Sequence, residues 1–144
     1  VVLRDCNVVQ RWVRFNTDMR TEKAKNIEVD PKAAILFYDA PAKVQIRLQV
    51  RLEILKGDAL GHIWRDTPHY SRECYQVTSA PGVAIESPHD VLFDADAADE
   101  GAEHFAPVRA HIEELEWLYL AVRGHRRARF RFHQDDIESQ WLVP

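Results

Sequence analysis

An unbroken alternation of apolar and polar residues from position 44 to position 54 is the feature that most constrains the fold. The apolar members are Val44, Ile46, Leu48, Val50, Leu52 and Ile54. The residues between them are Gln45, Arg47, Gln49, Arg51 and Glu53. A period of two matches the pleat of a β-strand, whereas a helix repeats every 3.6 residues. The segment is therefore predicted to be a long strand with one buried face, which is typical of β-barrels.

The rest of the chain indicates further strands and only short helices. Apolar or alternating runs predict strands over residues 1–3, 12–15, 33–38, 105–110, 115–122, 127–133 and 137–143. The continuous apolar run at 33–38 predicts burial on both faces. Good helix formers and capping residues predict helices over residues 21–27, 58–64 and 68–77. Because no strand–helix–strand unit recurs, an antiparallel barrel with helices at its edge fits better than a parallel sheet.

Composition indicates one ordinary globular domain over residues 1–144. Hydrophobic residues make up 46% of the 144 residues and charged residues 29%. A formal net charge of −4 gives no support for nucleic-acid binding. No apolar run reaches the roughly 18 residues of a membrane helix, so no membrane association is expected.

Cysteine and histidine usage provides no support for a disulfide framework or a metal site. Cys6 and Cys74 have no metal-ligand spacing, and two thiols without a framework favour a cytoplasmic protein. The seven histidines are dispersed and form no ligand motif. The chain begins at Val1 inside an apolar run, so a segment upstream of it is expected to be missing. The acidic stretch at 94–103 has no assigned role.

The first cluster of candidate site residues lies where a strand leads into a predicted helix. It is formed by Asn16, Thr17, Asp18, Met19, Arg20, Thr21, Glu22 and Lys23. Free N–H groups and the positive end of the helix dipole favour a phosphate at such a place. Two hydroxyls and two cations would add donors. The alternative is a plain helix cap with solvated charges.

Two further clusters lie on predicted strands. Gln45 and Arg47 share the polar face of the long alternating strand. Arg127, Arg129 and Arg131 share one face of a later strand, where like charges repel each other unless an anion lies opposite. Glu114 and Glu116 on the neighbouring strand would pair with two of the three, and a ligand phosphate or flavin ring would engage the third.

Several short motifs resemble, in order, those of the pyridoxamine 5′-phosphate oxidase-like superfamily, the FMN-binding split barrels. The family has Arg-x-Val-Leu-Leu-Lys, Phe-Tyr-Thr-Asn, Ser-Arg-Lys-Ala, Asn-Pro-x-Ala-Ala-Leu-x-Phe-Tyr and Arg-Gln-Val-Arg-Val. The matching strings are VVLR at 1–4, FNTD at 15–18, TEKA at 21–24, DPKAAILFY at 30–38 and VQIRLQV at 44–50. The C-terminal GHRRARF at 124–130 resembles a short subgroup of the same superfamily.

The resemblance implies an antiparallel Greek-key split β-barrel with FMN bound at a homodimer interface. It implies flavin contacts from Val2, Leu3, Arg4, Asn16, Thr17, Arg20, Thr21, Lys23, Gln45 and Arg129. In this scheme Thr17, Thr21 and Lys23 hold the phosphate and ribityl chain. Gln45 bonds the ring, and Arg129 reaches the flavin of the partner subunit.

The departures from the family pattern concern mainly the vitamin B6 substrate. Glu22 replaces a phosphate-binding arginine, so Arg20 or an upstream arginine is expected to compensate. The Tyr, Arg and Ser that bind the substrate phosphate in B6 oxidases correspond to Ile63, Thr67 and Ser71, and only Ser71 is kept. The Arg-Leu-His that clamps the substrate in B6 oxidases corresponds to His125, Arg126 and Arg127. Ser71 and Arg127 are therefore the only candidate substrate contacts.

The first functional hypothesis is an FMN-dependent oxidoreductase that acts on an unknown small molecule and does not prefer pyridoxamine phosphate. No general acid or base is evident, so its catalytic residues stay unassigned. A flavin carrier or redox sensor without turnover is the second hypothesis. A haem-binding split barrel with His125 or His133 as ligand is the third.

Overall fold

A computed structural model describes residues 1–93, 101–134 and 136–144. The acidic stretch at 94–103 lies largely outside these residues. The strands are β1 (Leu3–Asn7), β2 (Trp12–Asp18), β3 (Lys32–Asp39), β4 (Val44–Ile54), β5 (Phe105–Tyr119), β6 (Arg126–Phe132) and β7 (Ile137–Leu142). The helices are α1 (Glu22–Val29), α2 (Gly57–Asp66) and α3 (His69–Arg72), with short 3-10 turns η1 (Glu73–Tyr75), η2 (Pro88–Asp90) and η3 (Ala102–His104). The prediction of a mainly β, antiparallel chain with a few short helices is confirmed.

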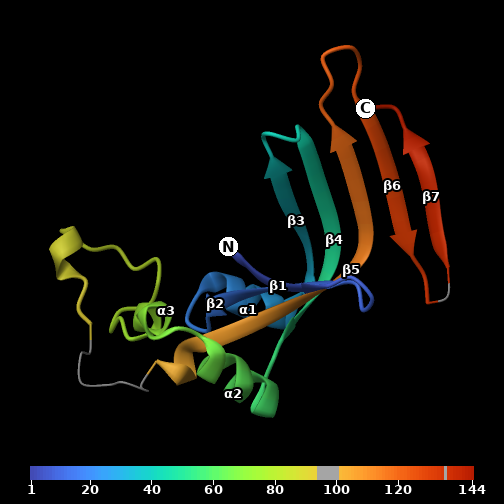
Figure 1. Cartoon of the computed structure of the whole chain (residues 1–144). Helices are drawn as coiled ribbons and strands as arrows, with labels where there is room; N and C mark the ends of the chain where they lie inside the picture. The colour runs from blue at the N-terminus through green and yellow to red at the C-terminus, as the bar shows by residue number, and fades with distance from the viewer. Residues whose placement is uncertain (94–100, 135) are drawn as a thin grey trace.

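The long strand β5 organises the sheet because it has three neighbours. All pairings in the 7-stranded sheet are antiparallel. Along one edge β5 pairs with β4, and along the other edge its first half pairs with β2 and its second half with β6. Figure 1 shows α1, α2 and α3 near the end where β5 begins, and β6 and β7 at the opposite end. The molecule therefore has a helix-covered end and a bare sheet end.

The prediction of two separate strands at 105–110 and 115–122 is wrong. The structure has one 15-residue strand, β5, in their place. Opposite β4, Gln49 pairs with Glu114 and Val50 with Ile112, so Glu113 is an extra residue in a β-bulge. A bulge bends a strand and interrupts its alternation without ending it. The local loss of pattern therefore looked like a break in the sequence.

The alternating segment forms β4 as predicted, and its apolar face builds the core. Leu48 and Val50 are 2% and 1% exposed, and they pack with Val13 and Ala110. Phe15, Ile27 and Val108 form a second cluster, through which α1 covers the barrel end. Burial of these side chains supplies the hydrophobic stabilisation of the domain.

The prediction that residues 33–38 are buried on both faces is wrong for the single chain. β3 ends the main strand order and pairs only with β4 among the described strands. Ala33, Ile35 and Phe37 pack against the core. Leu36 and Tyr38 on the other face are 59% and 58% exposed, because no further layer formed by the described residues covers this face.

The predicted helices are confirmed with shifted boundaries. Thr21, predicted as the first residue of a helix at 21–27, is instead the N-cap of α1. The predicted helix at 68–77 is divided into α3 and the 3-10 turn η1, with Pro68 as N-cap. None of the helices in the described part of the chain is long and apolar enough to cross a membrane.

Candidate functional site

The predicted site residues fall into two groups at opposite ends of the sheet. Thr17 pairs with Ala106 on β5, whereas Gln45 pairs with Leu118 on the same strand. Twelve residues of extended chain span about 40 Å, and a bend shortens this. Val2, Leu3, Arg4, Asn16, Arg20, Thr21, Lys23 and Ser71 belong to the helix-covered end, and Arg127 and Arg129 to the bare end. One copy of the chain does not bring the two groups together.

The turn between β2 and α1 is fixed by backbone and hydroxyl hydrogen bonds. The Thr21 Oγ1 donates to the Asp18 carbonyl at 2.7 Å and accepts from the Ala24 N–H at 3.2 Å. The Thr21 N–H donates to the same Asp18 carbonyl at 3.1 Å. Lys23, in the first turn of α1, is exposed. The arrangement holds a cation beside the positive end of the helix dipole, where anions are favoured.

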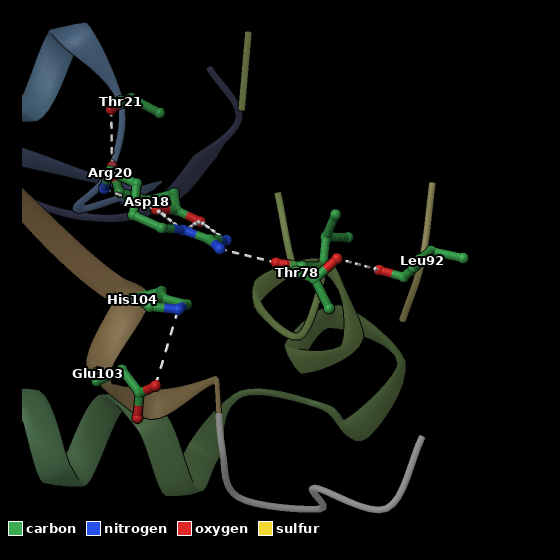
Figure 2. A network of polar contacts seen from close by, with 8 residues as sticks. Asp18, Arg20, Thr21, Thr78, Leu92, Glu103 and His104 are labelled. Carbon is green, nitrogen blue, oxygen red and sulfur yellow. Dashed lines mark hydrogen bonds and ion pairs between the residues drawn. The ribbon is translucent and has the colours of Figure 1, made fainter. Parts of the chain in front are cut away.

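Arg20 is engaged within the chain. Its Nε and Nη2 donate to the Asp18 carboxylate at 3.0 and 2.7 Å, and its Nη1 donates to the Val77 carbonyl at 2.7 Å (Figure 2). Asp18 is buried, and its hydrogen bond raises the pKa of Arg20. The guanidinium thus stays charged at every ordinary pH and links β2 to the segment after η1. The contact between Arg20 and flavin stays a prediction, and it requires the guanidinium to keep or exchange its bonds to Asp18 and Val77.

Other predicted flavin contacts of the first group lie on different faces. Thr17 is buried on the core side of β2. Val2 and Leu3 are exposed, and Leu3 borders a hollow of about 250 Å³ together with β2 and β3. Arg4 and Asn16 instead border a larger cleft on the outer side of the sheet. β2 therefore presents predicted contacts to two different spaces.

The larger cleft, of about 470 Å³, lies between β1, β2 and β5 and the helices α2 and α3. It brings Arg4 and Asn16 together with Ser71, which was predicted to contact the substrate. Its lining also includes Ile63 and Thr67, which hold the other two positions of the B6 substrate motif. We call this space the outer cleft. Three of the predicted contacts of the helix-covered end, Arg4, Asn16 and Ser71, converge there.

Two arginines of the outer cleft, Arg14 and Arg109, were not recognised from the sequence. Arg109 lies over the Trp12 ring, 5.0 Å from its centroid, and Arg14 donates to the Asn16 side chain at 3.1 Å. Alternation along residues 12–16 places Trp12, Arg14 and Asn16 on one face of β2, and this was the available signal. The approach of Arg109 depends on strand register, which the sequence does not reveal.

At the bare end, Gln45 and Arg127 lie in one small hollow. It measures about 130 Å³ and is also bordered by Arg47, Glu116 and Leu118. Arg127 is paired with Glu116 at 2.7 Å, so the acidic-partner alternative holds for this residue. The side chains of this hollow form a polar surface on the outer face of the sheet.

Of the four arginines of β6, the three that share one face, Arg127, Arg129 and Arg131, are not paired equally. Arg131 lies 2.8 Å from Glu114, whereas Arg129 lies 3.9 Å from the same carboxylate. When the Gln140 side-chain oxygen is turned toward Arg129, it accepts from the guanidinium. Arg129 is therefore the member of the series with the weakest carboxylate partner. This agrees with the expectation that glutamates satisfy two of the three.

The fold of this protein is an antiparallel barrel in which β5 runs from the helix-covered end to the bare end. Comparison with models of known protein families finds no match. Comparison with curated protein sequences finds none either. Among solved structures, a pyridoxamine 5′-phosphate oxidase-related, FMN-binding protein from Nostoc punctiforme matches with a TM-score of 0.79 and 21% identity, over 99% of this chain and 78% of that chain.

Two other solved structures share the fold. PhzG from Burkholderia lata, in complex with tetrahydrophenazine-1-carboxylic acid, has a TM-score of 0.70 and 19% identity, over 93% of this chain and 69% of that one. A general stress protein 26-related protein of the pyridoxinephosphate oxidase family from Clostridium acetobutylicum has a TM-score of 0.50 and 12% identity, over 95% and 70%. The chain therefore has the split-barrel fold of pyridoxamine 5′-phosphate oxidase-related proteins, as the sequence resemblance implied.

Proposed function

We propose that this protein binds FMN and acts as a flavin-dependent oxidoreductase on a small molecule other than pyridoxamine phosphate. The observation that carries the proposal is the start of α1, where Thr21 caps the helix and Lys23 adds an exposed cation. A phosphate is favoured at such a helix start. The Nostoc protein of the same fold is FMN-binding, which supports the same cofactor here.

The residues at this helix start fit a flavin phosphate in charge and donor type. The first-turn N–H groups of a helix have no partners from a preceding turn; that of Ala24 is taken by the Thr21 cap, and Lys23 supplies a positive charge beside the others. Glu22 opposes the phosphate, but it is exposed and can turn toward water. Bound FMN would supply the two-electron chemistry, and the protein would bind and orient it.

We further propose a homodimer, because the two groups of predicted flavin contacts are far apart in one chain. A second copy related by a two-fold axis would bring Gln45 and Arg129 of one subunit to the helix start of the other. The exposed apolar face of β3, with Leu36 and Tyr38, offers a surface that such a partner would cover. Sedimentation as a monomer in the presence of FMN would contradict this.

The outer cleft is the proposed substrate site, since it contains Arg4, Asn16 and Ser71. Ile63 and Thr67 stand where B6 oxidases have tyrosine and arginine, so the cleft lacks the donors that would hold pyridoxamine phosphate in the usual way. Arg127 lies at the bare end, on the other side of the proposed dimer contact. A contact between Arg127 and substrate would therefore come from the partner subunit.

Substitution of Lys23 tests the proposed phosphate site. Lys23→Ala is expected to weaken FMN binding about tenfold, the effect of losing one hydrogen bond to a charged group. Lys25→Ala is the matched control. Lys25 is also exposed on α1, but it lies two residues further from the helix start than Lys23. Quenching of flavin fluorescence during titration measures both affinities. Equal affinities of the two variants would contradict the assignment of Lys23.

A further inference from the structure

A row of four charged residues crosses the outer face of the sheet. Asp5 on β1 pairs with Arg14 on β2, Arg14 pairs with Arg109 on β5, and Arg109 pairs with Glu53 on β4. The order of charges across the strands is negative, positive, positive, negative. Residues directly opposite in an antiparallel pair have Cβ atoms about 5 Å apart, and like charges in such positions destabilise the sheet. The central arginine pair therefore needs an explanation.

The flanking carboxylates neutralise the two arginines only weakly. Arg14 Nη2 is 3.7 Å from the Asp5 carboxylate, and Arg109 Nη1 is 3.9 Å from the Glu53 carboxylate. Charge-assisted hydrogen bonds are about 2.7–2.9 Å long, so neither contact is a good hydrogen bond. The Glu53 carboxylate instead bonds His111 Nε2 at 3.0 Å. Positive charge is thus left between the two guanidinium groups.

Arg109 also carries a buried donor without an acceptor. Its Nε has no hydrogen-bond partner among the described residues, although the atom is shielded from solvent. An unsatisfied buried donor is costly, and more so when the group is charged. The guanidinium is held by stacking on Trp12, at 5.0 Å from the ring centroid. Because the Nε itself is shielded, an anionic oxygen in the cleft would meet the rest of this fixed guanidinium, whose side chain is 32% exposed.

Both arginines line the outer cleft, which has space for a small molecule. Its volume is about 470 Å³, and Arg4 adds a third guanidinium to the wall. Asp5 and Asp66 also line it, so positive groups outnumber carboxylates. Leu55, Ala59 and Ile63 provide apolar wall. The cleft thus combines a cationic floor with apolar sides, which suits an organic molecule that carries one anionic group.

We propose that Arg14 and Arg109 bind the carboxylate or phosphate of the small-molecule substrate in the outer cleft. The anionic oxygens would occupy the space between the two guanidinium groups and relieve their mutual repulsion. Guanidinium groups bind both kinds of anion through parallel N–H donors. The term substrate rests on the proposed flavin function, whereas anion binding itself does not.

Calorimetric titration with two probes, benzoate and phenyl phosphate, tests this site in FMN-loaded and FMN-free protein. Saturable binding of at least one probe is expected, and the preferred probe tells whether the site takes carboxylate or phosphate. Arg109→Gln is expected to weaken that binding at least tenfold. Arg51→Gln is the matched control. Arg51 lies on β4, is exposed, and forms an ion pair with Glu113 of β5 at 3.1 Å, outside the cleft. This variant should bind the probe as the unaltered protein does.

Three results would overturn the anion site: no saturable binding of either probe, equal binding by Arg109→Gln, or competition between the probe and FMN. Competition would mean that the cleft receives the phosphate of the flavin. If the protein binds FMN but neither probe, the anion site is wrong and the proposed flavin function stands. Probe binding through Arg109 without any FMN binding removes the proposed function and leaves the anion site.

Discussion

Phe105→Ala is expected to lower the free energy of unfolding by about 3–5 kcal/mol, the usual loss for removing a buried aromatic ring. Phe105 is 1% exposed at the start of β5. Its ring contacts Trp64 at 5.0 Å and Tyr75 at 5.1 Å between centroids. These partners come from α2 and η1, so one side chain joins the sheet to the helical cover. Urea denaturation measures the loss.

The control for this substitution is Tyr70→Ala on α3. Tyr70 is 74% exposed, so its removal is expected to change stability by less than about 0.5 kcal/mol. Because α2 and α3 form one wall of the outer cleft, Phe105→Ala is also expected to weaken binding of an anionic probe there. A loss of stability no larger than that of Tyr70→Ala would show that the aromatic cluster does not hold the helices on the sheet.

Asp18→Ala is expected to destabilise the protein by about 3 kcal/mol, because it leaves a half-buried guanidinium without its carboxylate. The Asp18 carboxylate accepts from Arg20 Nε and Nη2, and from the Arg20 backbone N–H at 2.8 Å. After the substitution, the side chain of Arg20 keeps its hydrogen bond to the Val77 carbonyl at 2.7 Å. The turn that leads into α1 would keep its bonds to the Asp18 carbonyl but lose those of the carboxylate, and FMN binding should weaken as well.

A double-mutant cycle with Arg20→Ala isolates this ion pair from the rest of the turn. The double variant is expected to be more stable than the sum of the two single losses implies, since it removes both charges together. Chemical denaturation of the four proteins gives the coupling energy. Simple additivity of the two losses would indicate that the pair contributes nothing of its own.

Local patterns in the sequence were sufficient for the elements they describe. The alternation at 44–54 depends only on neighbouring residues and on which face is buried, so it predicted β4 directly. The start of α1 was predicted to within one residue, because helix formers and capping residues are local signals: the helix was expected from residue 21, and Thr21 is its N-cap. These local signals favoured an antiparallel barrel, and the family resemblance then specified a Greek-key split barrel.

Features that depend on distant parts of the chain could not be predicted in this way. The bulge at Glu113 makes β5 continuous, but it exists only relative to β4. Arg20 reaches the Val77 carbonyl, which is 57 positions away in the sequence. The opposition of Arg14 and Arg109 requires the register between β2 and β5. Long-range register is set by tertiary packing, so the outer cleft and its arginines emerge only from the structure.

The most direct test of the central claim is whether the purified chain retains FMN. The protein is mixed with excess FMN, passed through a desalting column and examined by absorbance, and its melting temperature is measured with and without FMN. The proposal predicts a flavin spectrum in the protein fraction and a higher melting temperature, since a ligand at about 100 times its Kd stabilises by about 2.7 kcal/mol. A colourless protein fraction with an unchanged melting temperature would contradict it, and a Soret band would favour haem instead.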